Sequence, residues 1–387
     1  MSTVSTMSTG ELTQEQDAIA EAVGAFAAEH LAPHAVAWDR AKHFPVDVLR
    51  KAAGLGLAGI YVREDAGGSE LTRLDGVVAF EALAAGCPSI AAYLSIHNMV
   101  AWMIDRYGTE AQRSRWLPGL CAAEHLGSYC LTEPGAGSDA AALVTRAVRD
   151  GGHWTLHGVK QFISGAGTSQ VYLVMARTGG PGPGGVSAFL VDRDDPGLSF
   201  GPNEHKMGWN AQPTRQVLLD GVRLPADRLL GAEGEGFRIA MAGLNGGRIG
   251  IAACSLGGAR VALERATAYL ADREAFGTRL LHAQALQFRL ADMATELEAA
   301  RSLVRRAAAA MDRGDPRAPE LCAMAKRYAT DVGFDVANQA LQLHGGYGYL
   351  AEYGIEKIVR DLRVHQILEG TNEIMRVIVA RGLTGAA

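Results

Sequence analysis

The pattern of hydrophobic and polar residues divides the chain into three regions. Residues 11 to about 125 are predicted to be helical, because apolar positions such as Val23 and Phe26 recur at helical spacing. Thr13 with Gln16 three residues later predicts a capping box at the start of the first helix. Further helices are predicted at Val46–Ala53, ended by Gly54, at Leu74–Ala85, and at Tyr93–Tyr107, ended by Gly108.

From about residue 126 to 230 the pattern changes to short β-like runs separated by Gly, Pro and Asp. The predicted strands include His153–His157, Val171–Arg177, Val186–Asp192 and Gln216–Leu219. Strands so short and so closely spaced favour a small antiparallel barrel or sandwich over alternating strands and helices.

From about residue 236 onward, long Ala/Leu/Arg patterns predict helices of a bundle. The clearest stretches are Leu256–Phe276, Ala283–Met311 and Glu320–Gln342. The predicted fold is therefore α+β and mainly α, with domains at residues 1–125, 126–235 and 236–387.

Composition narrows the functional classes. The chain has 387 residues, a formal net charge of −5 and five scattered cysteines without a Cys-x-x-Cys pair. The charge does not favour binding to nucleic acid, and the cysteines indicate reduced thiols rather than disulfides. No continuous apolar run approaches 18 residues, so no membrane insertion is expected.

The Ser/Thr-rich N-terminus raises the question of a targeting segment. The first basic residue is Arg40, and Glu11, Glu15, Asp17 and Glu21 precede it. Transit peptides are rich in Arg and poor in acidic residues, and secretory signals begin with positive charge. We therefore expect no targeting segment and a cytoplasmic location.

Three motifs match functional patterns without the required context. The glycine run 180–185 fits a dinucleotide fingerprint, but a strand follows it where a helix is needed. The segment 197–201 fits the nucleophile elbow of a thioesterase with Ser199 as nucleophile, but prolines flank it. His30 with His34, and His153 with His157, lack a third ligand nearby. No metal is expected.

Two other segments carry chemistry. In Tyr129–Asp139, glycines let backbone N–H groups approach a planar or phosphate-bearing ligand, and Thr132 and Ser138 supply hydroxyls, although an ordinary Gly-Pro turn fits equally well. In Val364–Glu373, Glu369 ends one helical stretch and Gly370 breaks it. By spacing alone, that carboxylate is more often a solvated helix-end residue than a catalytic one.

With Arg273–Gly277 and His344–Tyr349, these two segments appear in the order found in the acyl-CoA dehydrogenases, which the chain resembles from about Leu12 to Leu383. The resemblance implies a helical domain, a β-barrel domain and a C-terminal four-helix domain, with FAD between the last two. It also implies an oligomer, typically a tetramer, and electron-transfer flavoprotein as the partner that accepts electrons.

The resemblance implies three groups of site residues. Glu369 is the expected catalytic base. The expected FAD contacts are Tyr129, Cys130, Leu131, Thr132, Glu133, Pro134, Gly135, Ala136, Gly137, Ser138, Phe162, Ile163, Ser164, Arg273, Ala283, Gln284, Gln342, Leu343, His344, Gly345, Gly346, Thr371, Asn372 and Glu373. The expected substrate contacts are Ser138, Asn245, Gly246, Gly247, Arg248 and Arg381.

The finer match is to members that oxidise short branched acyl-CoA thioesters, and isobutyryl-CoA, an intermediate of valine degradation, is the expected substrate. In the family, isovaleryl-type and long-chain members carry the base immediately before the arginine that matches Arg248 and lack it at the Glu369 position, whereas this chain has Gly247 and Glu369. That difference argues against isovaleryl-CoA. The alternatives are 2-methylbutyryl-CoA or butyryl-CoA as substrate, an oxidase that passes electrons to oxygen, a Ser199 thioesterase, and a non-catalytic binding member.

Overall fold

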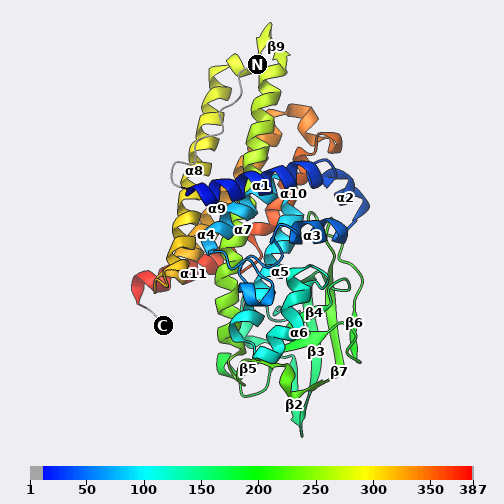
Figure 1. Cartoon of the computed structure of the whole chain (residues 1–387). Coiled ribbons are helices and arrows are strands. Elements are labelled where there is room, and N and C mark those ends of the chain that lie inside the picture. The colour runs from blue at the N-terminus through cyan, green and yellow to red at the C-terminus, as the bar shows by residue number, and fades with distance from the viewer. Residues whose placement is uncertain (1–11, 386–387) are drawn as a thin grey trace.

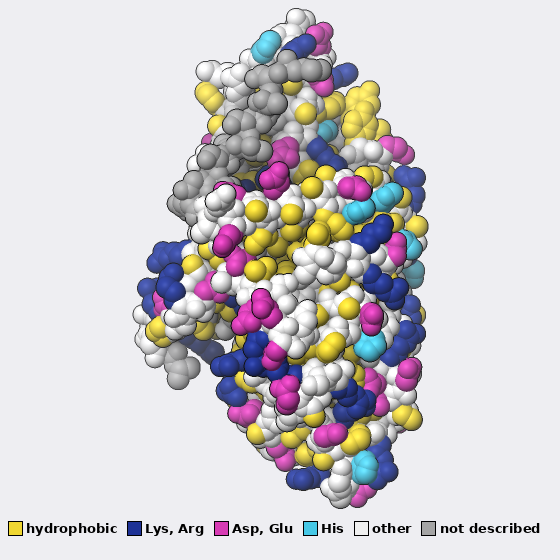
Figure 2. Space-filling view, in the orientation of Figure 1, with side chains coloured by type: hydrophobic (Ala, Val, Ile, Leu, Met, Phe, Trp, Pro, Cys, Tyr) yellow, Lys and Arg dark blue, Asp and Glu magenta, His cyan; other side chains and the backbone are white. Residues whose placement is uncertain are grey.

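The computed structural model describes residues 12–385. Most of the Ser/Thr-rich segment used for the targeting prediction lies outside the described residues. The protein is 58% helical, with a sheet at one end and long helices that extend from it to the other end (Figure 1). Figure 2 shows acidic and basic side chains interspersed over one face, as a small net charge would lead one to expect.

The N-terminal region contains the predicted helices and two more. Thr13 and Gln16 form the predicted capping box, with each side chain accepting a hydrogen bond from the other residue's backbone N–H. The helix predicted at Tyr93–Tyr107 begins five residues earlier, at Pro88, since proline suits a first helical turn. The helices are α1 (Gln14–His30), α2 (Ala35–Ala41), α3 (Val46–Ala53), α4 (Arg73–Gly86), α5 (Pro88–Tyr107) and α6 (Glu110–Cys121).

The middle region forms one eight-stranded sheet in the order β6-β7-β3-β2-β4-β5-β8, with β1 paired to β4. The expectation of a purely antiparallel sheet is wrong, because β1 runs parallel to β4. The predicted strands at 171–177 and 186–192 are confirmed. The strands are β1 (Gly127–Cys130), β2 (Arg146–Asp150), β3 (His153–Ser164), β4 (Val171–Arg177), β5 (Val186–Asp192), β6 (Leu198–Phe200), β7 (Thr214–Pro225) and β8 (Leu229–Leu230).

The C-terminal region is built on one long helix. The stretch predicted at 256–276 is the second half of α7, which begins twenty residues earlier and ends before Phe276, a residue at the tip of a short hairpin. The elements are α7 (Gly236–Asp272), β9 (Glu274–Ala275), β10 (Thr278–Arg279), α8 (Gln284–Asp312), α9 (Ala318–Leu343), α10 (Ile355–Arg363) and α11 (Asn372–Thr384).

Helix α7 forms the centre of the helical core and packs against α4, α5, α8 and α9. A side chain at Gly257 would lie 2.1 Å from the backbone oxygen of Glu81, so glycine allows α4 to approach α7 closely. Among helices of the described residues, α7 alone is long and apolar enough to cross a membrane, but 83% of its apolar window is buried inside the protein.

Candidate active site

Glu369 lies in a tight loop between the helical turn Val364–Gln366 and α11. Its backbone adopts a left-handed conformation with φ of 58°, and Gly370 follows with φ of 87°. A left-handed conformation costs a residue with a Cβ about 1–2 kcal/mol, and such strain is typical of functional sites. The two left-handed residues turn the chain sharply and direct the partly buried Glu369 side chain toward α7.

The Glu369 carboxyl group lies over Gly247 of α7. A Cβ atom built at Gly247 would lie 2.5 Å from Glu369 Oε2 and 2.8 Å from Cδ. Glycine at this position therefore leaves the space that the carboxyl group occupies. Oε2 is buried and accepts no hydrogen bond, which is costly for a carboxylate unless a ligand supplies a partner.

Three neighbours shape the electrostatics around Glu369. Arg248 donates from Nε to the Glu369 backbone oxygen at 3.3 Å and from Nη1 to Asn245 Oδ1 at 2.7 Å. Burial raises the pKa of Glu369 to about 7, against the opposing charges of Arg248 and Lys326. Burial and the Glu369 charge raise the pKa of Tyr129, whose hydroxyl is also buried without a partner. Tyr129, Asn245, Gly247 and Arg248 are thus brought together with Glu369.

The predicted segment 129–138 leaves β1 and forms an exposed turn. Gly135 and Gly137 face open space, since a Cβ at either would meet no atom within 4 Å, and Ser138 and Pro134 are also exposed. Glu133 instead faces inward, where it bonds to Lys160 and to the backbone N–H groups of residues 144 and 145. The side chains of Cys130, Leu131 and Ala136 are buried, and Thr132 is partly buried.

Phe162 projects from the sheet at an irregularity in β3. The pairing of β3 with β7 shifts register between Lys160 and Ile163, and Phe162 has φ of 59°. Its ring is left 63% exposed, while the Ile163 side chain is buried in the sheet core. The backbone oxygen of Ser164 accepts a hydrogen bond from Ser128 Oγ. Gln161, next to Phe162, donates its backbone N–H to the Thr132 oxygen at 2.8 Å, which joins this part of β3 to the segment that leads into the glycine turn. The exposed ring and the open turn together offer a flat surface for a planar ligand.

A second group of predicted residues lines a cavity of about 460 Å³ at the hairpin end of α7. Arg273 and the run from Gln342 to Gly346 line it together. Sequence reasoning did not single out Tyr269, whose ring stacks on His344 at 4.6 Å, although the aromatic character of the 344–349 motif was visible. The residues that line this cavity are Tyr269, Arg273, Leu280, Gln342, Leu343, His344, Gly345, Gly346, Tyr347 and Leu350.

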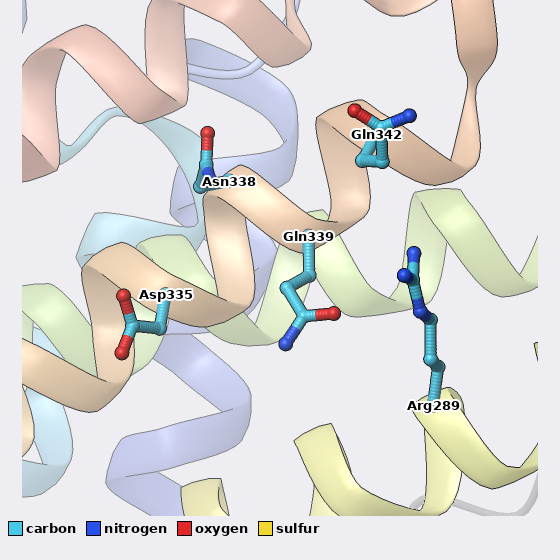
Figure 3. Close-up of a pocket in the computed structure, with 5 residues that line it drawn as sticks. All are labelled: Arg289, Asp335, Asn338, Gln339 and Gln342. Atoms are coloured by element: carbon cyan, nitrogen blue, oxygen red, sulfur yellow. The ribbon is translucent and has the colours of Figure 1, made fainter.

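A neighbouring cavity of 320 Å³ lies between α8 and α9 (Figure 3). Five polar side chains line it, and Gln342 belongs to both cavities. The other four, which sequence reasoning missed, are Arg289, Asp335, Asn338 and Gln339. Neither cavity includes Glu369, so the predicted site residues fall into two groups at different places along α7.

The remaining predicted residues take other positions. Thr371 caps α11 by accepting a hydrogen bond from the Ile374 backbone N–H. The Asn372 side chain is buried and bonded within the protein, whereas Glu373 is exposed. Ala283 is the N-cap of α8, and Gln284 is the first residue of that helix. Arg381 is exposed in the last turn of α11.

The competing motifs do not assemble into sites. Ser199 lies in β6, an outer strand of the sheet, with no helix after it, so the nucleophile elbow is absent from this segment. The glycine run 180–185 forms the loop between β4 and β5. In the part of the chain that the structure describes, no group of three His, Cys, Asp or Glu side chains could hold a metal ion.

Comparison with known families covers almost the whole chain. The acyl-CoA dehydrogenase N-terminal domain matches residues 13–124, the middle domain residues 128–222 and the C-terminal domain residues 234–384. The chain belongs to the acyl-CoA dehydrogenase family. Its enzyme class is therefore acyl-CoA dehydrogenase.

Two similar relatives of this acyl-CoA dehydrogenase are mitochondrial isobutyryl-CoA dehydrogenases. The Bos taurus protein is 54% identical over 96% of this chain and 89% of its own length. The Dictyostelium discoideum protein is 53% identical over 96% of this chain and 90% of its own length.

Solved structures of similar proteins have the same fold. Butyryl-CoA dehydrogenase from Megasphaera elsdenii is 38% identical, with a TM-score of 0.93 over 96% of this chain and 98% of the other. A chain described with the electron transferring flavoprotein of Acidaminococcus fermentans is 40% identical, with a TM-score of 0.94 over 96% and 98%. A Mycobacterium smegmatis glutaryl-CoA dehydrogenase in complex with FADH2 is 32% identical, with a TM-score of 0.92 over 97% and 96%.

The cofactor of this acyl-CoA dehydrogenase is FAD. Three observations in the chain fit a flavin: the exposed Phe162 ring, the open turn at Gly135 and Gly137, and the buried Tyr129 hydroxyl without a partner. In the larger cavity, Arg273 supplies a cation, and the two glycines after His344 allow a ligand to approach the backbone closely. Both features suit a pyrophosphate.

Proposed function

We propose that this acyl-CoA dehydrogenase oxidises isobutyryl-CoA to the α,β-unsaturated thioester, with Glu369 as the base that removes the α-proton. The observation that carries the proposal is the unpartnered Glu369 carboxyl oxygen over Gly247, beside Arg248. When bound, the flavin supplies the hydride acceptor. A role in valine degradation follows from this substrate.

The environment of Glu369 suits proton removal at neutral pH. A general base works best when its pKa is close to the working pH, and burial raises the pKa of Glu369 to about 7. A bound acyl chain would exclude water further and strengthen the base. The unpartnered Oε2 is free to accept the substrate proton without first breaking a hydrogen bond.

The backbone around Glu369 provides a donor for the thioester oxygen. Within residues 12–385, the Glu369 N–H makes no hydrogen bond, so it is free to stabilise negative charge on that oxygen. Arg248 bonds to the Glu369 backbone oxygen and holds the loop in place. Arg248 would therefore position both the Glu369 carboxylate and the Glu369 N–H that serves as the oxyanion donor.

The substrate proposal is supported by the two relatives named isobutyryl-CoA dehydrogenase. Leu368, next to the base, is partly buried and packs against the helical core. A hydrophobic pocket distinguishes a single methyl group by only about 1–3 kcal/mol. Butyryl-CoA and 2-methylbutyryl-CoA are therefore expected to react more slowly rather than to be rejected.

An oligomer, expected to be a tetramer, is supported by the separation of the two site groups. At 1.5 Å rise per residue, about 36 Å of α7 separates Arg248 from Asp272, the last helical residue before Arg273. A single extended dinucleotide cannot reach both places, so the cavity at Arg273 would serve the FAD of a neighbouring chain. The fully exposed Phe276 ring at the hairpin tip supports a partner there.

We further propose electron-transfer flavoprotein as the electron acceptor.

The test is an anaerobic titration of the FAD-loaded protein with four thioesters: isobutyryl-, butyryl-, 2-methylbutyryl- and isovaleryl-CoA. Isobutyryl-CoA is expected to bleach the flavin absorbance fastest. The Glu369→Gln variant is expected to keep FAD and lose bleaching, while Glu264→Gln, an exposed site on α7, keeps both.

Each alternative makes a different prediction. Faster bleaching by another thioester would replace the substrate but keep the activity. Loss of activity in Ser199→Ala would favour the thioesterase, and peroxide formed during aerobic turnover would indicate an oxidase. A protein that neither retains nor takes up FAD would support a non-catalytic role.

A further inference from the structure

Lys326 of α9 is a fully buried lysine directly beneath the Glu369 loop. Its Nζ donates to the backbone oxygen of Gly370 at 2.8 Å and to Asn372 Oδ1 at 2.8 Å. The first acceptor adjoins Glu369, and the second is the first residue of α11. One ammonium group therefore links α9 to both ends of the turn after Glu369.

The surroundings of Lys326 differ from those of the other fully buried lysines. Lys160 forms an ion pair with Glu133 at 2.7 Å, and Lys357 forms one with Asp361 at 2.6 Å. Lys326 instead bonds to neutral oxygens. A buried ammonium without an ion pair is costly, so burial disfavours the charged form of Lys326.

The charged groups around Lys326 come from several elements. Glu369 in the loop, Asp331 on the same helix and Glu373 on α11 favour its charged form, while Arg248 on α7 disfavours it. Glu369 is the largest of these charge effects. Burial, together with Arg248, lowers the pKa of Lys326 to about 7 against the effect of the three carboxylates. His365 also lies close enough to feel the Lys326 charge, and burial with that charge lowers the His365 pKa to about 3, which keeps it neutral.

We propose that Lys326 is a positioning residue for Glu369: its hydrogen bonds hold the left-handed turn at Glu369 and Gly370, and its positive charge, present up to about neutral pH, favours the ionised carboxylate over the protonated acid. This inference rests on the proposed role of Glu369 as the base. Lys326 does not touch the thioester, and it acts through the loop and through its charge.

The protonation of Glu369 distinguishes a charge effect of Lys326 from a purely structural role. An opposite charge within a few ångströms lowers a carboxyl pKa, so removal of the Lys326 charge raises the Glu369 pKa. The acidic limb of the activity profile then moves to higher pH. A lysine that only fills space and fastens helices would lower stability and leave that limb in place.

The experiment compares Lys326→Met with wild-type protein, each loaded with FAD. The rate of flavin bleaching by isobutyryl-CoA is measured from pH 5.5 to 9. The acidic limb in Lys326→Met is expected to shift upward by about one pH unit or more. Lys326→Arg, which keeps the charge, is expected to restore the limb toward its wild-type position.

A matched control is Thr330→Val on the same face of α9. Thr330 also bonds to Asn372 but is uncharged, so this variant loosens α9 from α11 without removing a charge. Its acidic limb is expected to stay in place. A Lys326→Met protein that is slower at every pH with an unmoved limb would overturn the proposal, as would an equal shift in Thr330→Val.

A direct titration distinguishes failure of this inference from failure of the proposed function. Infrared difference spectra report the protonated Glu369 carboxyl band, identified by its loss in Glu369→Gln, without substrate. If Lys326→Met does not fold, the same band is followed in Lys326→Arg and Lys326→Gln, and an unmoved Glu369 pKa in the folded Lys326→Gln overturns the proposal. If the band shifts while Glu369→Gln still bleaches the flavin, the proposed function fails and the charge coupling stands.

Discussion

The Glu369 carboxyl group occupies the space that any side chain at Gly247 would require. A Cβ at Gly247 would lie 2.5 Å from Glu369 Oε2, closer than two non-bonded heavy atoms can approach. Helix α7 and the loop after α10 meet at this point, although 122 residues separate Gly247 from Glu369 along the chain. The position of the carboxyl group therefore depends on a missing side chain in a distant helix.

Gly247→Ala is expected to displace the Glu369 carboxyl group and to lower the rate of flavin bleaching. A misplacement of about 1 Å costs roughly 100-fold in rate, and FAD should stay bound because Gly247 faces the carboxyl group. Stopped-flow absorbance with isobutyryl-CoA measures the loss. The control is Gly24→Ala in α1, where a Cβ meets no atom within 4 Å. Equal rates in Gly247→Ala and wild type would contradict the steric relationship.

The activity is expected to rise with pH through about 7. The base must be deprotonated to accept the α-proton, and burial raises the pKa of Glu369 to about 7. The value of kcat/KM should therefore fall below pH 7 and level off above it. A profile with its acidic limb near the ordinary glutamate value would show that Glu369 is not the group that limits the rate.

Glu369→Gln is expected to stabilise the protein at neutral pH. The folded chain holds the Glu369 proton up to about pH 7, whereas the unfolded chain releases it near the ordinary value of 4.5. This carboxyl group therefore lowers the free energy of unfolding as pH rises from 4.5 to 7. Denaturant unfolding at pH 5 and pH 8 measures the difference between variant and wild type, which should be larger at pH 8. A difference that does not grow with pH would contradict the raised pKa.

Glu133→Gln is expected to destabilise the middle region by about 3–5 kcal/mol, because it leaves the buried Lys160 ammonium without its counter-charge. It also weakens the bonds that hold the backbone at residues 144 and 145. Thermal unfolding with and without FAD measures the loss. The control is Glu264→Gln, which removes an exposed ion pair with Arg260 and should cost about 0.5 kcal/mol or less.

Local features of the fold were predicted well from the sequence. The capping box at Thr13 and the helix Val46–Ala53 follow from hydrogen bonds and turn residues within a few positions of one another. The first half of α7 was not delimited, because glycines at 243, 246 and 247 weaken its intrinsic helix propensity. Packing against α4 and α5 stabilises that half in the folded protein. The predicted helix end at Phe276 is four residues too late, because the β9–β10 hairpin that follows Asp272 has no strong local signal in the sequence.

The sequence by itself determined the family, the mainly helical class and the residues proposed for chemistry, because motifs and periodicity are properties of neighbouring positions. Only the tertiary structure decided what surrounds Glu369. The role of Gly247 as space for a carboxyl group and the bonds from Lys326 to the loop depend on α7, α9 and the 364–371 segment packing together. Burial sets the pKa of Glu369, and burial is a property of the packed protein rather than of any local run of residues.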